Sequence, residues 1–192
     1  MTDLSLYRPN VGVVLFHPDG RVWLGRRTNT PPPNWQFPQG GVDAGEDLLA
    51  AATRELAEET GVVSVTLLGR TDGWLTYDFP PEHKGSKVQR GWKGQRQVWF
   101  AFRFDGRDEE VDLKAHPPQE FDTWRWADID EAARLVVPFK RAIYEQVIEA
   151  FYSWSLRKQT WLSVDVQRIR NHGYNADRGP VNVGSVRLHA EF

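Results

Sequence analysis

The chain has 192 residues, of which 40% are hydrophobic and 26% charged, as in a globular protein with a buried core. No run approaches the roughly 20 apolar residues that span a bilayer, and the amino terminus lacks the basic-then-apolar layout of a secretory signal. A net charge of −2 argues against binding along a DNA duplex. The absence of cysteine excludes disulfides and thiolate metal sites and is compatible with a reducing compartment. Together with the lack of a membrane-spanning run, these features predict a cytoplasmic protein without a membrane partner.

The first half of the chain contains a predicted hairpin and a predicted helix. Residues 11–16 are apolar, and Asp19-Gly20 marks a tight turn before the apolar residues 22–24. A proline-rich loop at 30–34 and a glycine-rich loop at 40–45 follow. Residues 46–60 repeat apolar side chains at helical spacing, and Gly61 stands where a helix carboxyl-terminal glycine belongs.

The second half alternates predicted strands with one more helix. The strands are expected at residues 63–68, 73–79, 96–104 and 121–127. Residues 82–94 are polar and basic and predict a loop, and Pro138 opens the second helix. This mixture indicates an α/β sandwich in a domain spanning residues 1–155, followed by an extension at 156–192 whose pattern is weak.

Three glutamates on the first predicted helix form an unusual acidic cluster. At 100° per residue, Glu55, Glu58 and Glu59 share one face beside the apolar stripe of Leu49 and Leu56. Like charges three and four residues apart each cost roughly 0.2–0.5 kcal/mol, and acids in the last helical turn oppose the helix dipole. A solvated acidic face is the simpler interpretation, but acids misplaced in this way favour a functional site.

A bound cation would turn these unfavourable terms into favourable ones. The cluster offers oxygen ligands alone, and the five histidines are dispersed along the chain. Hard oxygen ligands suit Mg²⁺ or Mn²⁺ better than zinc. The sequence therefore predicts a magnesium or manganese site on this helix.

These residues also satisfy the pattern of a known family. The residues are Gly40, Glu46, Arg54-Glu55-Leu56, Glu58-Glu59 and Gly61-Val62. Their spacing matches every fixed position of the Nudix box, so the segment resembles that motif. The resemblance implies an α/β/α sandwich with a mixed β-sheet. It also implies that Glu55, Glu58 and Glu59 hold the metal, that the Gly40 carbonyl adds a ligand, and that Arg54 orients a glutamate.

The resemblance extends over about residues 6–154 and is strongest to the bacterial RNA pyrophosphohydrolases, a subgroup that overlaps the dinucleoside polyphosphate hydrolases. It is carried by Tyr7-Arg8-Pro9-Asn10-Val11-Gly12, Trp35-Gln36-Phe37-Pro38-Gln39-Gly40-Gly41, Gly94-Gln95, Glu120-Phe121-Asp122, Trp124-Arg125-Trp126 and Phe139-Lys140-Arg141. By this resemblance Glu120 reaches the metal site. The resemblance also implies that Arg27 and Phe139 enclose a base. The residues that it implies contact the phosphates or the nucleotide are Arg8, Gln39, Tyr77, Gln95 and Lys140.

Other interpretations of these residues stay open. Arg8 and Lys140 are also compatible with ordinary surface charges, and Phe139 with a core position. Gln39 is compatible with a residue that braces its loop. Among Glu58, Glu59 and Glu120, the sequence does not choose the general base.

The expected activity is metal-dependent hydrolysis of the 5′ triphosphate or diphosphate of RNA to a 5′ monophosphate, which implies a role in mRNA decay. A dinucleoside polyphosphate such as diadenosine tetraphosphate is the alternative substrate. A non-catalytic Nudix binding module is a remote alternative, because no box glutamate is lost. An RNA-binding domain that uses the basic segment 84–96 is opposed by the net charge.

Overall fold

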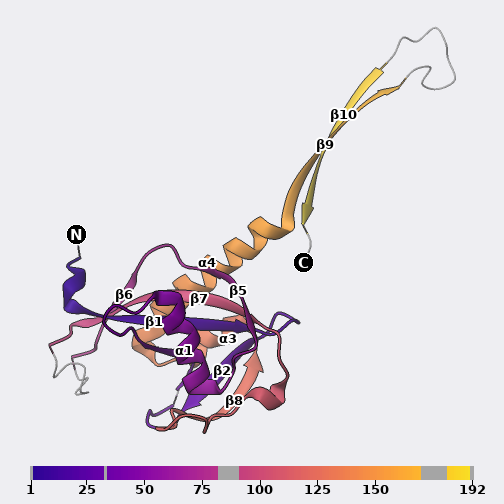
Figure 1. Cartoon of the computed structure of the whole chain (residues 1–192). Helices are drawn as coiled ribbons and strands as arrows, with labels where there is room; N and C mark the ends of the chain where they lie inside the picture. Colours follow the sequence, from indigo (N-terminus) through magenta and orange to yellow (C-terminus); the bar gives the residue numbers. More distant parts are fainter. Residues whose placement is uncertain (1, 33, 82–90, 170–180, 191–192) are drawn as a thin grey trace. The chain divides into compact units, whose positions relative to one another are not determined.

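The computed structural model describes residues 2–32, 34–81, 91–169 and 181–190, with side chains through Phe151. The chain divides into two compact units, Met1–Ala150 and Phe151–Phe192 (Figure 1). Part of the predicted basic loop, residues 82–90, lies outside the described residues.

The first unit is built on an eight-stranded sheet. Its strands are β1 (Tyr7–Phe16), β2 (Val22–Arg27), β3 (Trp35–Gln36), β4 (Gln39–Gly41), β5 (Val65–Arg70), β6 (Leu75–Asp78), β7 (Gly94–Phe104) and β8 (Phe121–Ala127). The helical elements that end in this unit are η1 (Leu4–Leu6), α1 (Leu48–Thr60), η2 (Asp108–Glu110), α3 (Ile129–Leu135) and η3 (Pro138–Lys140). The last helix, α4 (Arg141–Gln159), runs on into the second unit.

Strand pairing makes the sheet mixed. The central strands β1 and β7 run parallel over their whole length, from Tyr7 opposite Gly94 to Phe16 opposite Arg103. The other pairs in the sheet are antiparallel, including β5 and β6 against β7, and β4 against β1. The predicted α/β class with a mixed sheet is confirmed.

Helices cover both faces of this sheet. On one face Val11 and Phe100 pack against Leu56 of α1. Because alternate residues of a strand point to opposite faces, Gly12 and Trp99 lie on the other face, where Trp99 contacts Tyr144 of α4 at a ring centroid distance of 5.5 Å. These two groups of packed side chains place α1 on one face of the sheet and the start of α4 on the other (Figure 1).

The predicted hairpin and the predicted first helix are both present. Phe16 pairs with Val22 across the turn, and Gly20 has a φ of 92° that favours glycine. Helix α1 begins two residues later than predicted, because the Asp47 side chain accepts hydrogen bonds from the backbone of Leu49 and Ala50 and caps it. Gly61 ends the helix in a left-handed conformation with a φ of 76°.

One part of the predicted apolar stripe is wrong. Leu49 is 37% exposed, whereas its neighbour Leu48 packs against the core. The buried side of the helix instead comprises Ala51, Ala52, Leu56, Glu59 and Thr60. One of the three clustered acids is thus itself part of the buried face.

Several elements were missed in the sequence, among them the short strands β3 and β4, one helix and a pair of strands in the second unit. The segment after β8 forms the short helix α3, which begins with a capping box between Asp128 and Glu131. In the second unit, β9 (Thr160–Ile169) and β10 (Val181–Ala190) pair antiparallel where no pattern was recognised. The domain boundary at residue 155 stays a prediction. Within the described residues, no helix is long and apolar enough to cross a membrane.

Candidate active site

A pocket of about 560 Å³ gathers most of the predicted site residues. They come from β1, β2, β4, α1, β6, β7, η3 and the residue before β8. The predicted residues that line it are Arg8, Arg27, Gln39, Gly40, Glu55, Tyr77, Gln95, Glu120, Phe139 and Lys140. Arg54, Glu58 and Glu59 do not line the pocket. Arg54 contacts Glu55 and Glu59 contacts Gln39, both of which line it, whereas Glu58 contacts Arg54.

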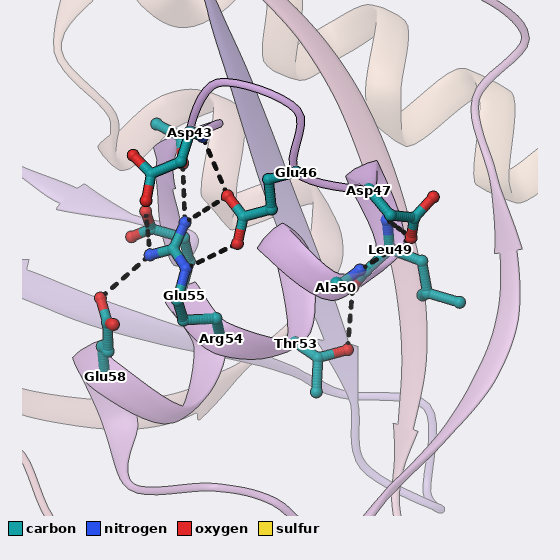
Figure 2. A network of polar contacts seen from close by, with 10 residues as sticks. Asp43, Glu46, Asp47, Leu49, Ala50, Thr53, Arg54, Glu55 and Glu58 are labelled. Carbon is teal, nitrogen blue, oxygen red and sulfur yellow. Dashed lines mark hydrogen bonds and ion pairs between the residues drawn. The ribbon is translucent and has the colours of Figure 1, made fainter.

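Arg54 is the centre of a charge network on α1 (Figure 2). Its guanidinium donates two hydrogen bonds to Glu46, at 2.8 and 2.9 Å, and one to the Gly41 carbonyl at 3.0 Å. It also donates to Glu55 at 2.9 Å and to Glu58 at 3.2 Å. The Arg54 hydrogen bonds hold the pKa of Glu46 down to about 2, so this carboxylate is fully charged at neutral pH.

Glu55 lies against the glycine-rich loop. A side chain at Gly40 would overlap the Glu55 carboxylate, so glycine is required for the carboxylate to reach this backbone. Burial raises the pKa of Glu55, and the Arg54 hydrogen bond lowers it again in part. Glu55 and the Gly40 backbone are thus held together at the pocket wall.

Glu59 is the most deeply buried of the three acids. It is 6% exposed, and its Oε2 accepts a hydrogen bond from the Gln39 backbone N–H at 2.9 Å. Burial raises its pKa to about 8, opposed by that hydrogen bond and by the charges of Arg27 and Lys140. A carboxylate with so little compensation gains strongly from any cation that reaches it.

The donor set fits a hard divalent cation in chemistry, since it consists of carboxylates and one carbonyl. Among the described residues, however, no three acidic or histidine side chains lie together as a ready metal cluster. Arginines explain this arrangement, because Arg54 holds Glu55 and Glu58 while Arg27 forms an ion pair with Glu120. Each of these contacts engages one oxygen of its carboxylate, so the second oxygen could hold an ion while the arginine stays in place.

The cationic residues of the pocket are partly or largely buried. Lys140 is 8% exposed, and its Nζ donates to Gln36 Oε1 at 3.2 Å. Arg8 is half-buried and donates to Asn10 Oδ1 at 3.1 Å. Both line the pocket, so their charges face a cavity rather than open surface.

Two aromatic rings stand beside these cations. Phe139 is half-buried and lies 5.8 Å from Tyr77 between ring centroids. Arg27, its expected partner in enclosing a base, lies 5.8 Å from the Phe121 ring. The enclosure of a base between Arg27 and Phe139 stays a prediction, although both residues line the same pocket.

A chain of neutral hydrogen bonds runs along β7 on the pocket side. Trp99 Nε1 donates to Gln97 Oε1 at 3.2 Å, and Gln97 Nε2 donates to Gln95 Oε1 at 3.2 Å. Tyr77 donates its hydroxyl to the same Gln95 oxygen at 2.6 Å. The three β7 side chains are buried, so this chain of bonds is shielded from water.

Gln97 and Gln36 are two of the polar residues that the sequence analysis did not place at the site, and Asn29 and Thr30 of the pocket lining are two more. Gln36 is 6% exposed and accepts from Lys140, and Gln97 is fully buried. A signal for Gln97 was present, because glutamines that alternate within a strand otherwise rich in aromatic and aliphatic residues indicate a polar stripe on one face. No comparable signal exists for Gln36, which lies next to a proline-rich loop.

Comparison with known proteins identifies the family of the chain. The family model of the NUDIX domain matches residues 6–147, and the chain therefore belongs to the Nudix family. The chain is 65% identical over 159 residues to the RNA pyrophosphohydrolase of Caulobacter vibrioides, covering 81% of this chain and 92% of that protein. It is also 52% identical over 143 residues to the RNA pyrophosphohydrolase of Rhodospirillum rubrum, covering 74% and 85% of the two chains.

Solved structures support the fold. The C. elegans Ap4A hydrolase in a binary complex matches with a TM-score of 0.57 at 23% identity, covering 77% of this chain and 96% of that one. The E. coli dihydroneopterin triphosphate pyrophosphohydrolase matches with a TM-score of 0.56 at 22% identity, covering 74% and 97%. The family resemblance seen in the sequence is confirmed.

Proposed function

We propose that the protein removes pyrophosphate from the 5′ end of triphosphorylated RNA, or phosphate from diphosphorylated RNA, and leaves a 5′ monophosphate. One observation carries the proposal: a single pocket combines the acids Glu55 and Glu120 with the cations Arg8, Arg27 and Lys140. Acids alone would repel a polyphosphate, and cations alone would not hold a metal. The names of the relatives, at up to 65% identity among those compared, support the RNA substrate.

Magnesium or manganese is the proposed cofactor, and the residues proposed to hold it are Glu55, Glu58, Glu59, Glu120 and the Gly40 carbonyl. Such an ion supplies charge neutralisation on the phosphate and lowers the pKa of a water molecule. Within this arrangement Arg54 orients Glu55 and Glu58. The proposed general base is one of Glu58, Glu59 and Glu120, since a carboxylate beside a metal-held water suits proton transfer.

The cationic and aromatic residues are proposed to bind the substrate. The planar guanidinium group of Arg8 suits phosphate oxygens, and Lys140 contributes a point charge from the pocket wall. Arg27 and Phe139 are proposed to enclose a terminal base, while Tyr77 and Gln95 contact the phosphates or the nucleotide. Gln39 lines the same pocket and is proposed as a further nucleotide contact.

Product analysis tests the proposal. A 5′-triphosphorylated RNA of a few nucleotides is incubated with the protein and Mg²⁺, and the released products are separated. Pyrophosphate together with 5′-monophosphorylated RNA is the expected result. Intact RNA under conditions in which the folded protein binds Mg²⁺ would contradict the proposal.

A dinucleoside polyphosphate is the second candidate substrate, favoured by the structural match to an Ap4A hydrolase. The two substrates are compared by kcat/KM at identical Mg²⁺ concentration. We expect the RNA to be preferred, and more so as it is lengthened. A higher kcat/KM for diadenosine tetraphosphate would reverse the assignment. A cytoplasmic location and a role in mRNA decay are part of the same proposal.

A further inference from the structure

The hydrogen-bond chain along β7 has a direction that its chemistry dictates. An indole N–H is a donor and has no acceptor, so the atom of Gln97 that faces Trp99 must be the carbonyl oxygen. The amide nitrogen of Gln97 then faces Gln95, and the atom of Gln95 that it meets must again be an oxygen. Trp99 thereby determines the orientation of two successive amides.

Both acceptor positions of Gln95 Oε1 are taken. One is filled by Gln97 Nε2 and the other by the Tyr77 hydroxyl. The Gln95 amide nitrogen therefore carries two N–H groups that none of the described residues uses, at a residue that lines the pocket. At this point the pocket wall presents a donor, which suits the oxygen of a phosphate or of a base carbonyl.

We propose that Gln97 is a positioning residue that, held by Trp99, keeps the Gln95 amide turned with its N–H groups toward the substrate. A glutamine without this restraint rotates between two orientations of similar shape, one of which places a carbonyl oxygen against phosphate oxygens. The inference rests on the proposed function, because it assumes that the pocket binds a polyphosphate. It adds Gln97, which does not line the pocket but bonds Gln95, which does.

Burial explains why this restraint is strong. Gln95 is 1% exposed, and Gln97 and Trp99 are fully buried, so water does not substitute for a missing partner. Tyr77 alone would still bond either a carbonyl as donor or an amide as acceptor, since a hydroxyl has both functions. Gln97 therefore supplies the selectivity that Tyr77 lacks.

The test combines Gln97→Met with Gln95→Met in a double-mutant cycle. Methionine has a similar shape and removes the amide, so Gln97→Met should raise KM for a short triphosphorylated RNA roughly tenfold with kcat nearly unchanged. The dissociation constant for inorganic pyrophosphate should rise by a similar factor. In the double variant, Gln97→Met should add almost nothing to the loss caused by Gln95→Met.

The matched control is Thr71→Val. Thr71 is buried and its Oγ1 accepts from the Trp99 backbone at 3.1 Å, so this variant also removes a buried hydrogen bond to β7. It should lower the melting temperature and leave KM unchanged. A wild-type KM in Gln97→Met, or losses that multiply in the double variant, would overturn the inference.

A second measurement covers the case in which Gln97→Met does not fold. In the wild-type protein, addition of inorganic pyrophosphate should shift the side-chain amide proton signals of Gln95 and leave those of Gln97 in place. Pyrophosphate that binds without moving the Gln95 signals contradicts the inference alone. Failure of the wild-type protein to bind pyrophosphate or cleave either substrate contradicts the proposed function and the inference together.

Discussion

Two walls of the same pocket satisfy their polar groups in opposite ways. Behind the wall to which α1 contributes Glu55, Glu59 is buried with one backbone hydrogen bond, and Glu55 and Glu58 share a single arginine. On the wall formed by β7, the oxygens of Gln95 and Gln97 are each matched to donors from the protein. The carboxylates on the first side have few donors to compensate them, whereas the amide oxygens on the second side are each matched to donors.

The difference indicates that the two sides of the pocket have different functions. A carboxylate cluster that the protein itself compensates fully would gain little from a metal ion. A neutral wall that is left unsatisfied would bind substrate in several orientations. The same pocket therefore stores electrostatic strain where an ion is expected and avoids it where the substrate is to be oriented.

Removing the charge of Glu59 is expected to have the largest effect on activity. Glu59→Gln keeps the shape of the side chain and an oxygen for the Gln39 backbone N–H, so the fold should persist. Loss of the carboxylate should lower kcat by about 10²–10⁴-fold at saturating Mg²⁺, the usual contribution of a carboxylate base. Steady-state kinetics on triphosphorylated RNA measure this.

Glu145→Gln on the exposed side of α4 is the matched control for that variant and should behave as wild type. Near-normal kcat in Glu59→Gln would show that the acidic wall of the pocket is not the place where the metal and the proton transfer are organised.

The stability of the metal-free protein should depend on the same carboxyl group. Because burial raises the folded pKa of Glu59 to about 8, above its ordinary value of 4.5, the folded state holds this proton more tightly than the unfolded state. Stability should therefore fall as pH rises from about 4.5 to about 8, by a few kcal/mol at most. Thermal unfolding in EDTA across this range measures the effect.

Glu59→Gln provides the comparison for the pH series. It lacks the titrating group, so in EDTA it should be more stable than wild type at pH 8 and lose less stability over the same range. Mg²⁺ should restore the wild-type protein and not the variant. A wild-type curve that rises between pH 5 and 8 with the same slope as the variant would remove Glu59 as the cause.

Replacing Arg54 by lysine should weaken metal binding, with a smaller effect than the loss of the Glu59 carboxylate has on kcat. Arg54→Lys keeps the charge but cannot bond Glu46, Glu55 and the Gly41 carbonyl at once, because a lysine lacks the planar fork. Loss of groups that orient metal ligands typically costs about 10–100-fold in metal affinity. Calorimetric titration with Mg²⁺ or Mn²⁺ should show a loss in this range.

Arg21→Lys is the matched control, since Arg21 forms an exposed pair with Asp19 at 2.7 Å, in the turn between β1 and β2. It should leave metal affinity unchanged. Equal affinities in wild type and Arg54→Lys would mean that Glu55 and Glu58 need no orientation by this arginine.

The contrast between the two walls also marks how far the sequence could be interpreted. The box spacing located the acids, and the Asp19-Gly20 turn and Gly61 located the hairpin and the helix end, because these signals are local. The burial of Glu59 and the ion pair of Arg27 with Glu120 depend on residues far apart in the chain, which periodicity does not bring together. The start of helix α3 was predictable from the sequence, since Asp128 and Glu131 have the spacing of a capping box.

Leu49 gives the smallest expected effect and tests where the apolar side of α1 ends. From spacing alone, Leu49 and Leu56 belong to one buried stripe, and truncating either to alanine should cost about 2–5 kcal/mol. In the structure Leu56 is fully buried while Leu49 is 37% exposed. Leu49→Ala should therefore change the free energy of unfolding by less than about 0.5 kcal/mol, since an exposed site leaves no cavity. Leu56→Ala, measured beside it in urea, should show the full loss, and comparable losses in the two variants would place Leu49 in the core after all.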